Sequence, residues 1–200
     1  MQHERLFNVL FGLSILSWAF IGIYFGQVNS EVGIVRITVF ILNFLVGILV
    51  LIRRPIIALA NTTDTLLCIP SFLCAGLLFK LTIPVMDWDF KVQVLFTLGG
   101  TITILSFLEL GRSFAILPDK RKIKKGTLYQ VIRHPAYFGE SLMLLACAIS
   151  ATTYWSWLVL IIFFPFLFLR ILKEERFLVK FKEYESYAKN TRWRLFPYLW

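Results

Sequence analysis

The sequence has few charged residues and few cysteines. Asp, Glu, Lys and Arg make up 16% of its 200 residues, whereas a soluble globular domain has about a quarter. This low charge, together with 58% hydrophobic residues, excludes a soluble domain, a disordered chain and a coiled coil. Cys68, Cys74 and Cys147 lie in apolar segments without CxxC spacing or a paired histidine. Neither a disulfide scaffold nor a metal site is therefore predicted.

The glycines do not form a nucleotide-binding loop. Gly99 and Gly100 lie inside an apolar segment and lack the G-x-G-x-x-G spacing that follows a strand. A Rossmann-type dehydrogenase or methyltransferase is therefore disfavoured. Gly22 and Gly26 have the GxxxG spacing that lets membrane helices approach closely. Packing within the chain is favoured over dimerisation, and the oligomeric state stays open.

Long apolar runs dominate the chain. Crossing a bilayer takes about 20 apolar residues, and the first run has no small-residue cleavage site, so it is expected to stay as a span. The last two runs are short and separated only by Thr152 and Thr153, which predicts a tight helical hairpin and leaves five or six crossings. The predicted fold class is all-α, a polytopic membrane protein with five or six transmembrane helices. The six runs cover residues 6–27, 35–52, 65–81, 92–111, 136–151 and 154–170.

The basic residues behind the formal net charge of +9 are distributed unevenly between the loops on the two sides of the predicted membrane segments. On a soluble protein such an excess would suggest nucleic acid. If the N-terminus is cytoplasmic, all of the 21 Lys and Arg except Arg36, Lys80 and Lys91 fall on the cytoplasmic side, as the positive-inside rule requires. The charge therefore predicts an orientation and no nucleic-acid partner. With six spans both termini are cytoplasmic, and the active site is expected to face the same side.

The two halves differ within what is expected to be a single membrane domain, 1–200. Residues 1–111 are N-terminal transmembrane segments with short loops, whereas residues 112–200 hold a basic loop, a hairpin and an amphipathic tail. Chemistry is therefore expected in 112–200, as a cofactor-binding catalytic core. In the tail, residues 174–187 place Phe177, Phe181 and Tyr184 on one stripe, which predicts an interfacial C-terminal helix.

A cluster of ligand-binding residue types stands where the basic loop re-enters the membrane. The basic run 120–125 needs no role beyond topology or anionic-lipid contact, although it could also close over an anionic ligand. Pro135 favours the first turn of a helix, which puts His134 near the N-cap, where free backbone N–H groups can receive an anion. Tyr129 and Tyr137 flank this point. Each alone resembles an interfacial belt residue, but the cluster favours a ligand site.

Ionisable residues in or near the apolar segments are the other candidates. Arg170 and Glu174 are four apart and share one helix face, either as a snorkelling surface pair or as functional groups. Glu140 lies inside the fifth segment and is a candidate functional group for the same reason. Glu109 stands at the end of the fourth and could pair with Arg112 at i+3.

These motifs and their order along the chain resemble those of a known family. The order is Gly111-Arg-Ser-Phe114, Tyr129, Arg133-His-Pro-Ala-Tyr137, Arg170-x-x-x-Glu174-Glu175 and Leu195-Phe-Pro197. Over about residues 107–197 it resembles the integral-membrane methyltransferases that include isoprenylcysteine carboxyl methyltransferase and phospholipid N-methyltransferases.

The resemblance implies S-adenosylmethionine as cofactor and a lipophilic or lipidated substrate, alongside membrane lipids. Arg170 and Glu174 would be catalytic, and Arg170 and Glu140 would bind the substrate. The leading acceptor is the carboxylate of an isoprenylcysteine-like substrate, because an arginine can hold it in a bidentate fork. The cofactor-binding residues would be Lys122, Ile123, Lys124, Tyr129, His134, Pro135, Ala136, Tyr137 and Glu174.

Three alternatives stay open. One is a phospholipid or small-molecule N- or S-methyltransferase, in which an amine acceptor would lose a proton to Glu140 or Glu174. Another is an NADPH-dependent sterol-type reductase, because sterol reductases are similar in an ending like Arg194-Leu-Phe-Pro-Tyr198. The last is a membrane scaffold whose basic loop binds only anionic lipid.

Overall fold

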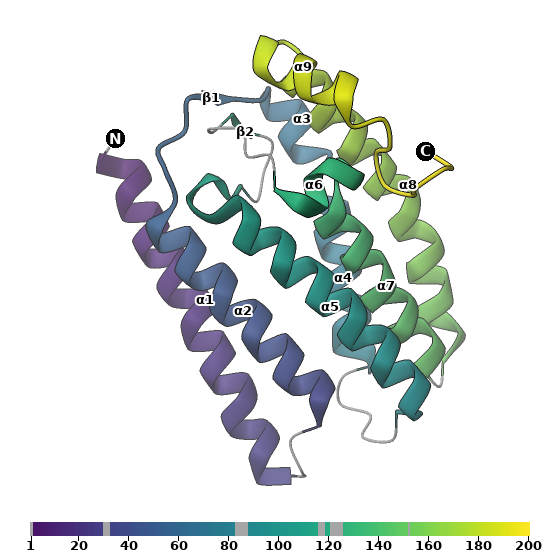
Figure 1. The fold of residues 1–200 in the computed structure, drawn as a ribbon. Helices are drawn as coiled ribbons and strands as arrows, with labels where there is room; N and C mark the ends of the chain where they lie inside the picture. Colours follow the sequence, from purple (N-terminus) through teal and green to yellow (C-terminus); the bar gives the residue numbers. More distant parts are fainter. Residues whose placement is uncertain (1, 30–32, 83–87, 116–118, 121–125, 152) are drawn as a thin grey trace.

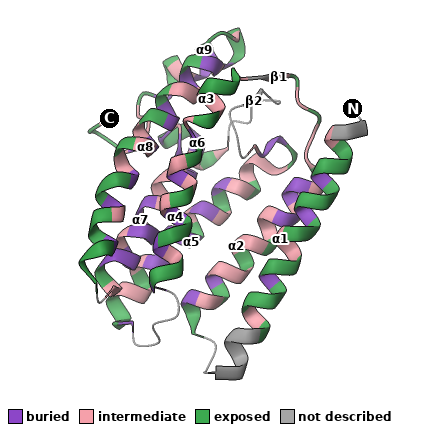
Figure 2. Cartoon of the chain, turned by 180° about the vertical axis from the view of Figure 1, so that it is seen from behind, coloured by how far each residue is buried: buried purple, intermediate pink, exposed green. Residues whose placement is uncertain are grey.

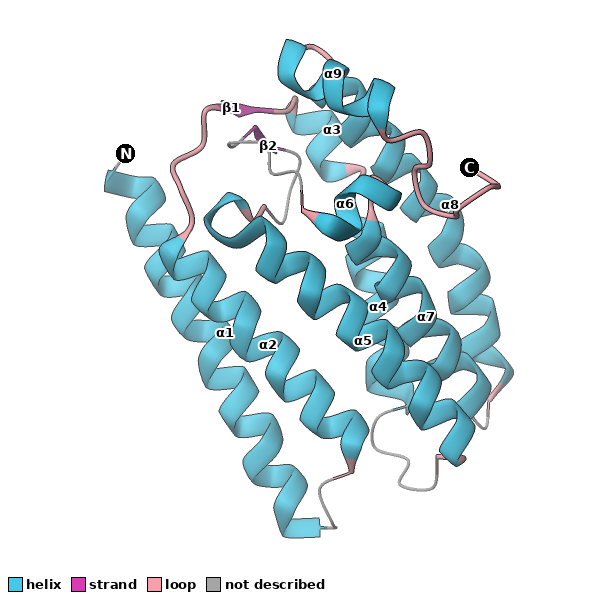
Figure 3. Ribbon diagram, viewed as in Figure 1, coloured by secondary structure: helices cyan, strands magenta, loops and turns pink. Residues whose placement is uncertain are grey.

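The computed structural model describes residues 2–29, 33–82, 88–115, 119–120, 126–151 and 153–200, which are almost entirely helical (Figures 1 and 3). The helices are α1 (Gln2–Asn29), α2 (Ile34–Ile52), α3 (Thr62–Leu66), α4 (Ile69–Thr82), α5 (Phe90–Leu110), α6 (Thr127–Val131), α7 (Pro135–Ser150), α8 (Tyr154–Leu178) and α9 (Lys182–Asn190), with a 3₁₀ turn η1 (Gly111–Ser113). Two short strands, β1 (Ala58–Leu59) and β2 (Asp119–Lys120), pair antiparallel.

The prediction of an all-α polytopic membrane protein is confirmed. Within the described residues, five helical segments are long and apolar enough to cross a membrane. α7 is also apolar but has only 16 residues, which keeps the number of crossings at five or six. The five segments are Glu4–Tyr24, Ile34–Ile52, Thr62–Thr82, Phe90–Ser113 and Tyr154–Leu178.

The helices run alternately up and down, so that both ends of the described chain lie at the same end of the bundle (Figure 1). η1, α6 and α9 gather at that end, which is called the loop end below. α1 packs along α2, α5 along both α2 and α7, and α4 along α8. This arrangement places the basic ends of the helices together, as the charge pattern predicts. That the loop end faces the cytoplasm stays a prediction.

Buried and exposed residues alternate along the helices (Figure 2), and many of the exposed ones are large and apolar. The core lies between α4, α5, α7 and α8, where Phe96, Leu144, Phe163 and Leu167 are fully buried. Large apolar residues cover the outside, for example Trp155, whose exposed fraction is 69%. An apolar exterior of this extent is suited to lipid rather than water.

Small residues allow the closest helix contacts. A Cβ added to Gly139 of α7 would overlap the carbonyl oxygen of Gly99 and the hydroxyl of Thr103 on α5. α1 and α2 approach each other in the same way at Gly12 and Gly47. The expected close packing within the chain at Gly22 is wrong, because a Cβ there would meet nothing within 4 Å.

Gly139→Ala is expected to lower the stability by about 2 kcal/mol, because the added methyl group meets backbone atoms of α5 that cannot rotate away. Thermal unfolding of the purified protein in detergent measures this change. Gly76→Ala on α4 is the matched control, since its methyl group would meet nothing within 4 Å. Equal melting temperatures for the two variants would contradict the packing role of Gly139.

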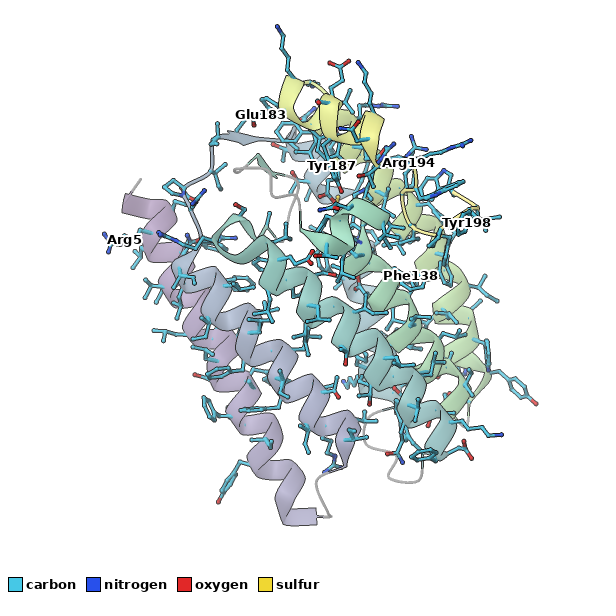
Figure 4. The ribbon with its side chains drawn as sticks, viewed as in Figure 1. Arg5, Phe138, Glu183, Tyr187, Arg194 and Tyr198 are labelled. Carbon is cyan, nitrogen blue, oxygen red and sulfur yellow. The ribbon has the colours of Figure 1, made fainter. Side chains whose placement is uncertain are left out.

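The prediction of one continuous helix over 174–187 is wrong. α8 continues to Leu178, and α9 starts at Lys182 after an extended Phe181 with φ −107° and ψ 122°. Glu174 therefore belongs to the last turns of α8. The break turns the amphipathic α9 back so that Tyr184 and Tyr187 are buried at the loop end while Glu183 stays exposed (Figure 4).

Candidate active site

An extended segment between α6 and α7 joins the start of α7 to the C-terminal segment. Ile132 forms a parallel bridge with Trp193. The backbone N–H groups of Arg133 and His134 donate to the carbonyl oxygens of Trp193 and Arg194, each at 2.9 Å. The motif that begins at Arg133 is thus fixed by residues about 60 positions later in the chain.

Glu175 is the centre of the charged groups at this junction. Its side chain is buried, and it accepts hydrogen bonds from Arg133 Nη1 at 3.0 Å and from Arg194 Nε at 2.7 Å. His134 Nε2 lies 3.4 Å from the same carboxylate. One carboxylate therefore pairs with two guanidinium groups and lies beside an imidazole. No role was predicted for Glu175, although the Glu174-Glu175 doublet places carboxylates on two neighbouring faces of the helix.

Arg133 acts as a clamp rather than as part of an open ligand site. Besides its two bonds to Glu175, its guanidinium donates to the carbonyl oxygens of Thr191 at 2.7 Å and Ala188 at 2.9 Å. These bonds tie α8, the end of α9 and the C-terminal segment together. Arg133, the first residue of the motif that continues through His134 to Tyr137, therefore has a structural role.

The start of α7 is built as the sequence predicts. His134 is the N-cap residue and Pro135 stands at the first helical position. The rings of His134 and Tyr137 stack in parallel, with centroids 5.3 Å apart. The Tyr137 hydroxyl donates to Glu174 Oε2 at 2.7 Å. Together with the buried Ala136, the structure thus brings these five predicted cofactor-binding residues to one place.

Tyr129 lies beside this group. It is buried against Tyr184 and Tyr187, and its carbonyl oxygen accepts a hydrogen bond from the Tyr187 hydroxyl at 2.7 Å. Burial, and then the negative charge of Glu174, raise the pKa of the Tyr129 phenol well above its usual value. The phenol therefore stays protonated and can act as a hydrogen-bond donor near Glu174.

Arg170 points into the protein, so the interpretation as a snorkelling surface pair is wrong. Its guanidinium lies over the rings of Phe72 at 3.8 Å and Tyr137 at 4.4 Å. Arg170 Nη1 is 3.4 Å from Ser71 Oγ and 4.0 Å from Glu140 Oε2. The predicted substrate-binding pair, Arg170 and Glu140, is thus brought together, and its exposed fractions are only 4% and 18%.

Tyr137 connects the two parts of the site. Its ring contacts both the imidazole of His134 and the guanidinium of Arg170, and its hydroxyl donates to Glu174. Ser71 and Phe72 on α4 complete the surroundings of Arg170. These two α4 residues were not predicted, because nothing in their apolar segment distinguishes them from neighbouring core residues.

The remaining predictions concern the basic loop, the pairing of Glu109 and metal binding. Lys122, Ile123 and Lys124 lie outside the described residues. The expected pair of Glu109 with Arg112 is wrong, because Glu109 instead accepts from the backbone N–H of Leu128 at 3.1 Å. Arg112 Nε donates to the carbonyl oxygen of Ile52 at 3.0 Å. In the part of the chain that the structure describes, no group of three or more His, Cys, Asp or Glu could hold a metal ion.

Residues 92–185, from α5 into α9, match the family model described as phospholipid methyltransferase. The matched stretch is similar to that family and makes up just under half of the chain. The match confirms the resemblance to integral-membrane methyltransferases, a superfamily that includes the isoprenylcysteine enzymes, and it indicates a methyltransferase embedded in the membrane. No curated protein and no solved structure matches the chain significantly.

The matched region contains every described residue that the sequence analysis assigned to the site. It includes the start of α7, with His134 and Tyr137, and the end of α8, with Arg170 and Glu174. This overlap favours methyl transfer over the reductase and the scaffold as the activity of this membrane protein. The side chains that α4 adds, Ser71 and Phe72, lie outside the matched region.

Proposed function

We propose that the chain is an S-adenosylmethionine-dependent methyltransferase that acts on a lipophilic acceptor in the membrane. The leading acceptor is the carboxylate of an isoprenylcysteine-like lipid. One observation carries the proposal, which is that Tyr137 joins a carboxylate, Glu174, to a buried guanidinium, Arg170. One side of this ring is suited to the cofactor and the other to an anionic acceptor.

The residues at the start of α7 fit the proposed cofactor. The Glu174 carboxylate, held by the Tyr137 hydroxyl at 2.7 Å, is complementary to an ammonium group. The stacked rings of His134 and Tyr137 offer an aromatic surface, and the helix N-terminus favours a carboxylate. When bound, S-adenosylmethionine supplies a methyl group on a sulfonium, and displacement from it requires positioning and exclusion of water.

Arg170 has the properties needed to position a carboxylate acceptor. A carboxylate is already nucleophilic, so the protein has no proton to remove. Phe72 and Tyr137 cover the guanidinium and reduce its access to water, which strengthens its attraction for an anion. A planar guanidinium can also fix both oxygens of the carboxylate at once. The acceptor would reach the site laterally from the bilayer, and the cofactor from the loop end.

Methylation of a phospholipid amine is the second candidate. It is favoured by the match to phospholipid methyltransferases and by Glu140, whose Oε2 lies 4.0 Å from Arg170 Nη1. An amine must lose its proton before it attacks, and Glu140 or Glu174 would accept that proton. Incubation with labelled cofactor and either an isoprenylcysteine analogue or phosphatidylethanolamine separates the candidates. Label on a carboxyl group leaves as methanol in alkali, whereas label on nitrogen is retained.

Cofactor binding provides the direct test of the proposed function. Titration calorimetry of the purified protein in detergent with S-adenosylhomocysteine is expected to show binding. Glu174→Gln is expected to weaken it at least tenfold, because a charge-assisted contact contributes about 1.5–3 kcal/mol. Tyr137→Phe is expected to weaken it about tenfold through the loss of its bond to Glu174.

Tyr154→Phe is the control for these variants, since Tyr154 is exposed and stands at the far end of α8 from Glu174. Its affinity for S-adenosylhomocysteine is expected to equal that of the unmodified protein. The proposal would be overturned if the protein bound no S-adenosylhomocysteine, or if Glu174→Gln bound it equally well. A rise in melting temperature with NADPH instead would favour the reductase.

A further inference from the structure

A pocket away from the candidate active site lies at the loop end, between α1, α2 and η1. It has a volume of about 670 Å³. None of the residues around it belongs to the site described above, and all but Arg112 lie outside the region matched by the methyltransferase family. The lining residues are Glu4, Arg5, Asn8, Leu51, Ile52, Arg53, Pro55 and Arg112.

The pocket carries an excess of positive charge. Three arginines, Arg5, Arg53 and Arg112, line it together with a single carboxylate, Glu4. Arg53 Nε donates to Oδ1 of Asn8 at 2.9 Å, and Asn8 is itself more than nine-tenths buried. Arg5 and Arg112 are exposed on the surface. Such a lining attracts an anion, and the planar guanidinium groups suit the oxygens of a phosphate.

Hydrogen bonds between the elements hold the walls in place. Arg112 Nε donates to the carbonyl oxygen of Ile52 at 3.0 Å, and the N–H of Arg54 donates to the carbonyl oxygen of Arg112 at 2.8 Å. On the opposite wall the N–H of Ile56 donates to Glu4 Oε1 at 3.2 Å. These bonds join η1 to the end of α2 and the segment after α2 to α1, so the backbone around the pocket is held in place.

The position of the pocket matches the headgroup layer of a bilayer. Three membrane-crossing segments, Glu4–Tyr24, Ile34–Ile52 and Phe90–Ser113, end beside it. Arg5, near the N-terminal end of α1, lies at the outer edge of the bundle (Figure 4). On the next turns of α1, Phe7 and Leu10 are exposed with fractions of 57% and 61%. A ligand here meets positive charge at its head and an apolar surface alongside its tail.

We propose that this pocket binds the phosphate headgroup of an anionic phospholipid, whose acyl chains lie along α1. The arginines bind the phosphate, and Leu51, Ile52 and Pro55 contact the apolar part next to it. Basic pockets between helices at this depth are suited to anionic headgroups. This binding site is independent of the proposed methyl transfer.

A titration with short-chain lipid tests the proposal. The melting temperature of the full chain in an uncharged detergent is followed against dihexanoyl-phosphatidylglycerol, dihexanoyl-phosphatidylcholine and inorganic phosphate. Phosphatidylglycerol is expected to stabilise at the lowest concentration. Arg5→Gln with Arg112→Gln is expected to raise its half-saturating concentration about 30-fold, at about fivefold for each arginine near an anionic headgroup. Arg5→Lys, which keeps the charge, is expected to bind within twofold of the unmodified protein.

The control is Lys180→Gln with Lys182→Gln, which removes two exposed positive charges at the same end of the bundle. An equal loss of affinity in this control would overturn the proposal, since attraction would then be a general surface effect. Equal stabilisation by phosphatidylcholine or by inorganic phosphate would overturn the assignment to an anionic lipid. If the double variant does not fold, the single Arg5→Gln decides. Arg5 forms no ion pair with any described residue, and about a fivefold loss is expected.

Discussion

Glu175→Gln is expected to lower the free energy of unfolding by about 3–5 kcal/mol, the cost of breaking a buried ion pair by removing one partner. The amide keeps the shape of the carboxylate but leaves Arg133 and Arg194 without their counter-charge. Because Arg133 also joins α8 to the end of α9 and the C-terminal segment, the loss should spread over the whole loop end. Thermal unfolding in detergent, followed by tryptophan fluorescence, measures it.

Glu185→Gln is the matched control for this prediction. Glu185 pairs with Lys189 one turn away on the exposed side of α9. The melting temperature of the Glu185→Gln variant is therefore expected to equal that of the unmodified protein. Arg133→Met should destabilise the protein as well. The double variant with Glu175→Gln should lose less than the sum of the two, since both changes break the same interaction. Strict additivity would show that the two groups do not depend on each other.

Arg170→Met is expected to lower kcat/KM for methyl transfer at least 100-fold while cofactor affinity changes less than threefold. Truncating one member of a buried charged contact costs about 2–5 kcal/mol, and Arg170 Nη1 lies 4.0 Å from Glu140 Oε2. Arg170→Lys should lower kcat/KM nearly as much, because an ammonium group can neither form a bidentate contact with a carboxylate nor stack on two rings. Transfer of labelled methyl groups and cofactor titration provide the two readouts.

Arg176→Gln serves as the control, because Arg176 is exposed on the same helix. It is expected to transfer methyl groups at the unmodified rate. Activity of Arg170→Met within twofold of that rate would contradict the role of Arg170. A parallel loss of cofactor binding would move Arg170 from the acceptor side of the site to the cofactor side.

The helices and the start of α7 could be predicted because local chemistry determines them. Apolar runs of spanning length have no other stable form in a bilayer, and a proline at the first helical position makes the residue before it the cap. The pairing of Arg170 with Glu140 was also predictable in kind, since ionisable groups in apolar segments seek each other.

The remaining features depend on tertiary packing. Adjacent residues on a helix point about 100° apart, so the rotation of α8 decides that Glu175 faces the arginines and Glu174 faces Tyr137. Arg112 is a possible partner three residues after Glu109. Glu109 instead accepts a hydrogen bond from the backbone N–H of Leu128, which packing of α6 brings beside it. Phe72 could not be singled out, because only the contact of α4 with α8 places it over Arg170.

The position of Tyr137 has a consequence for the kinetics of the protein. One ring forms the wall of both halves of the site, with Glu174 at its hydroxyl and Arg170 over its face. A ligand that shifts this ring from one side alters the room available on the other, so the two substrates are expected to influence each other's affinity. Because such coupling is reciprocal, the factor by which the methyl donor tightens the acceptor must equal the factor by which the acceptor tightens the donor.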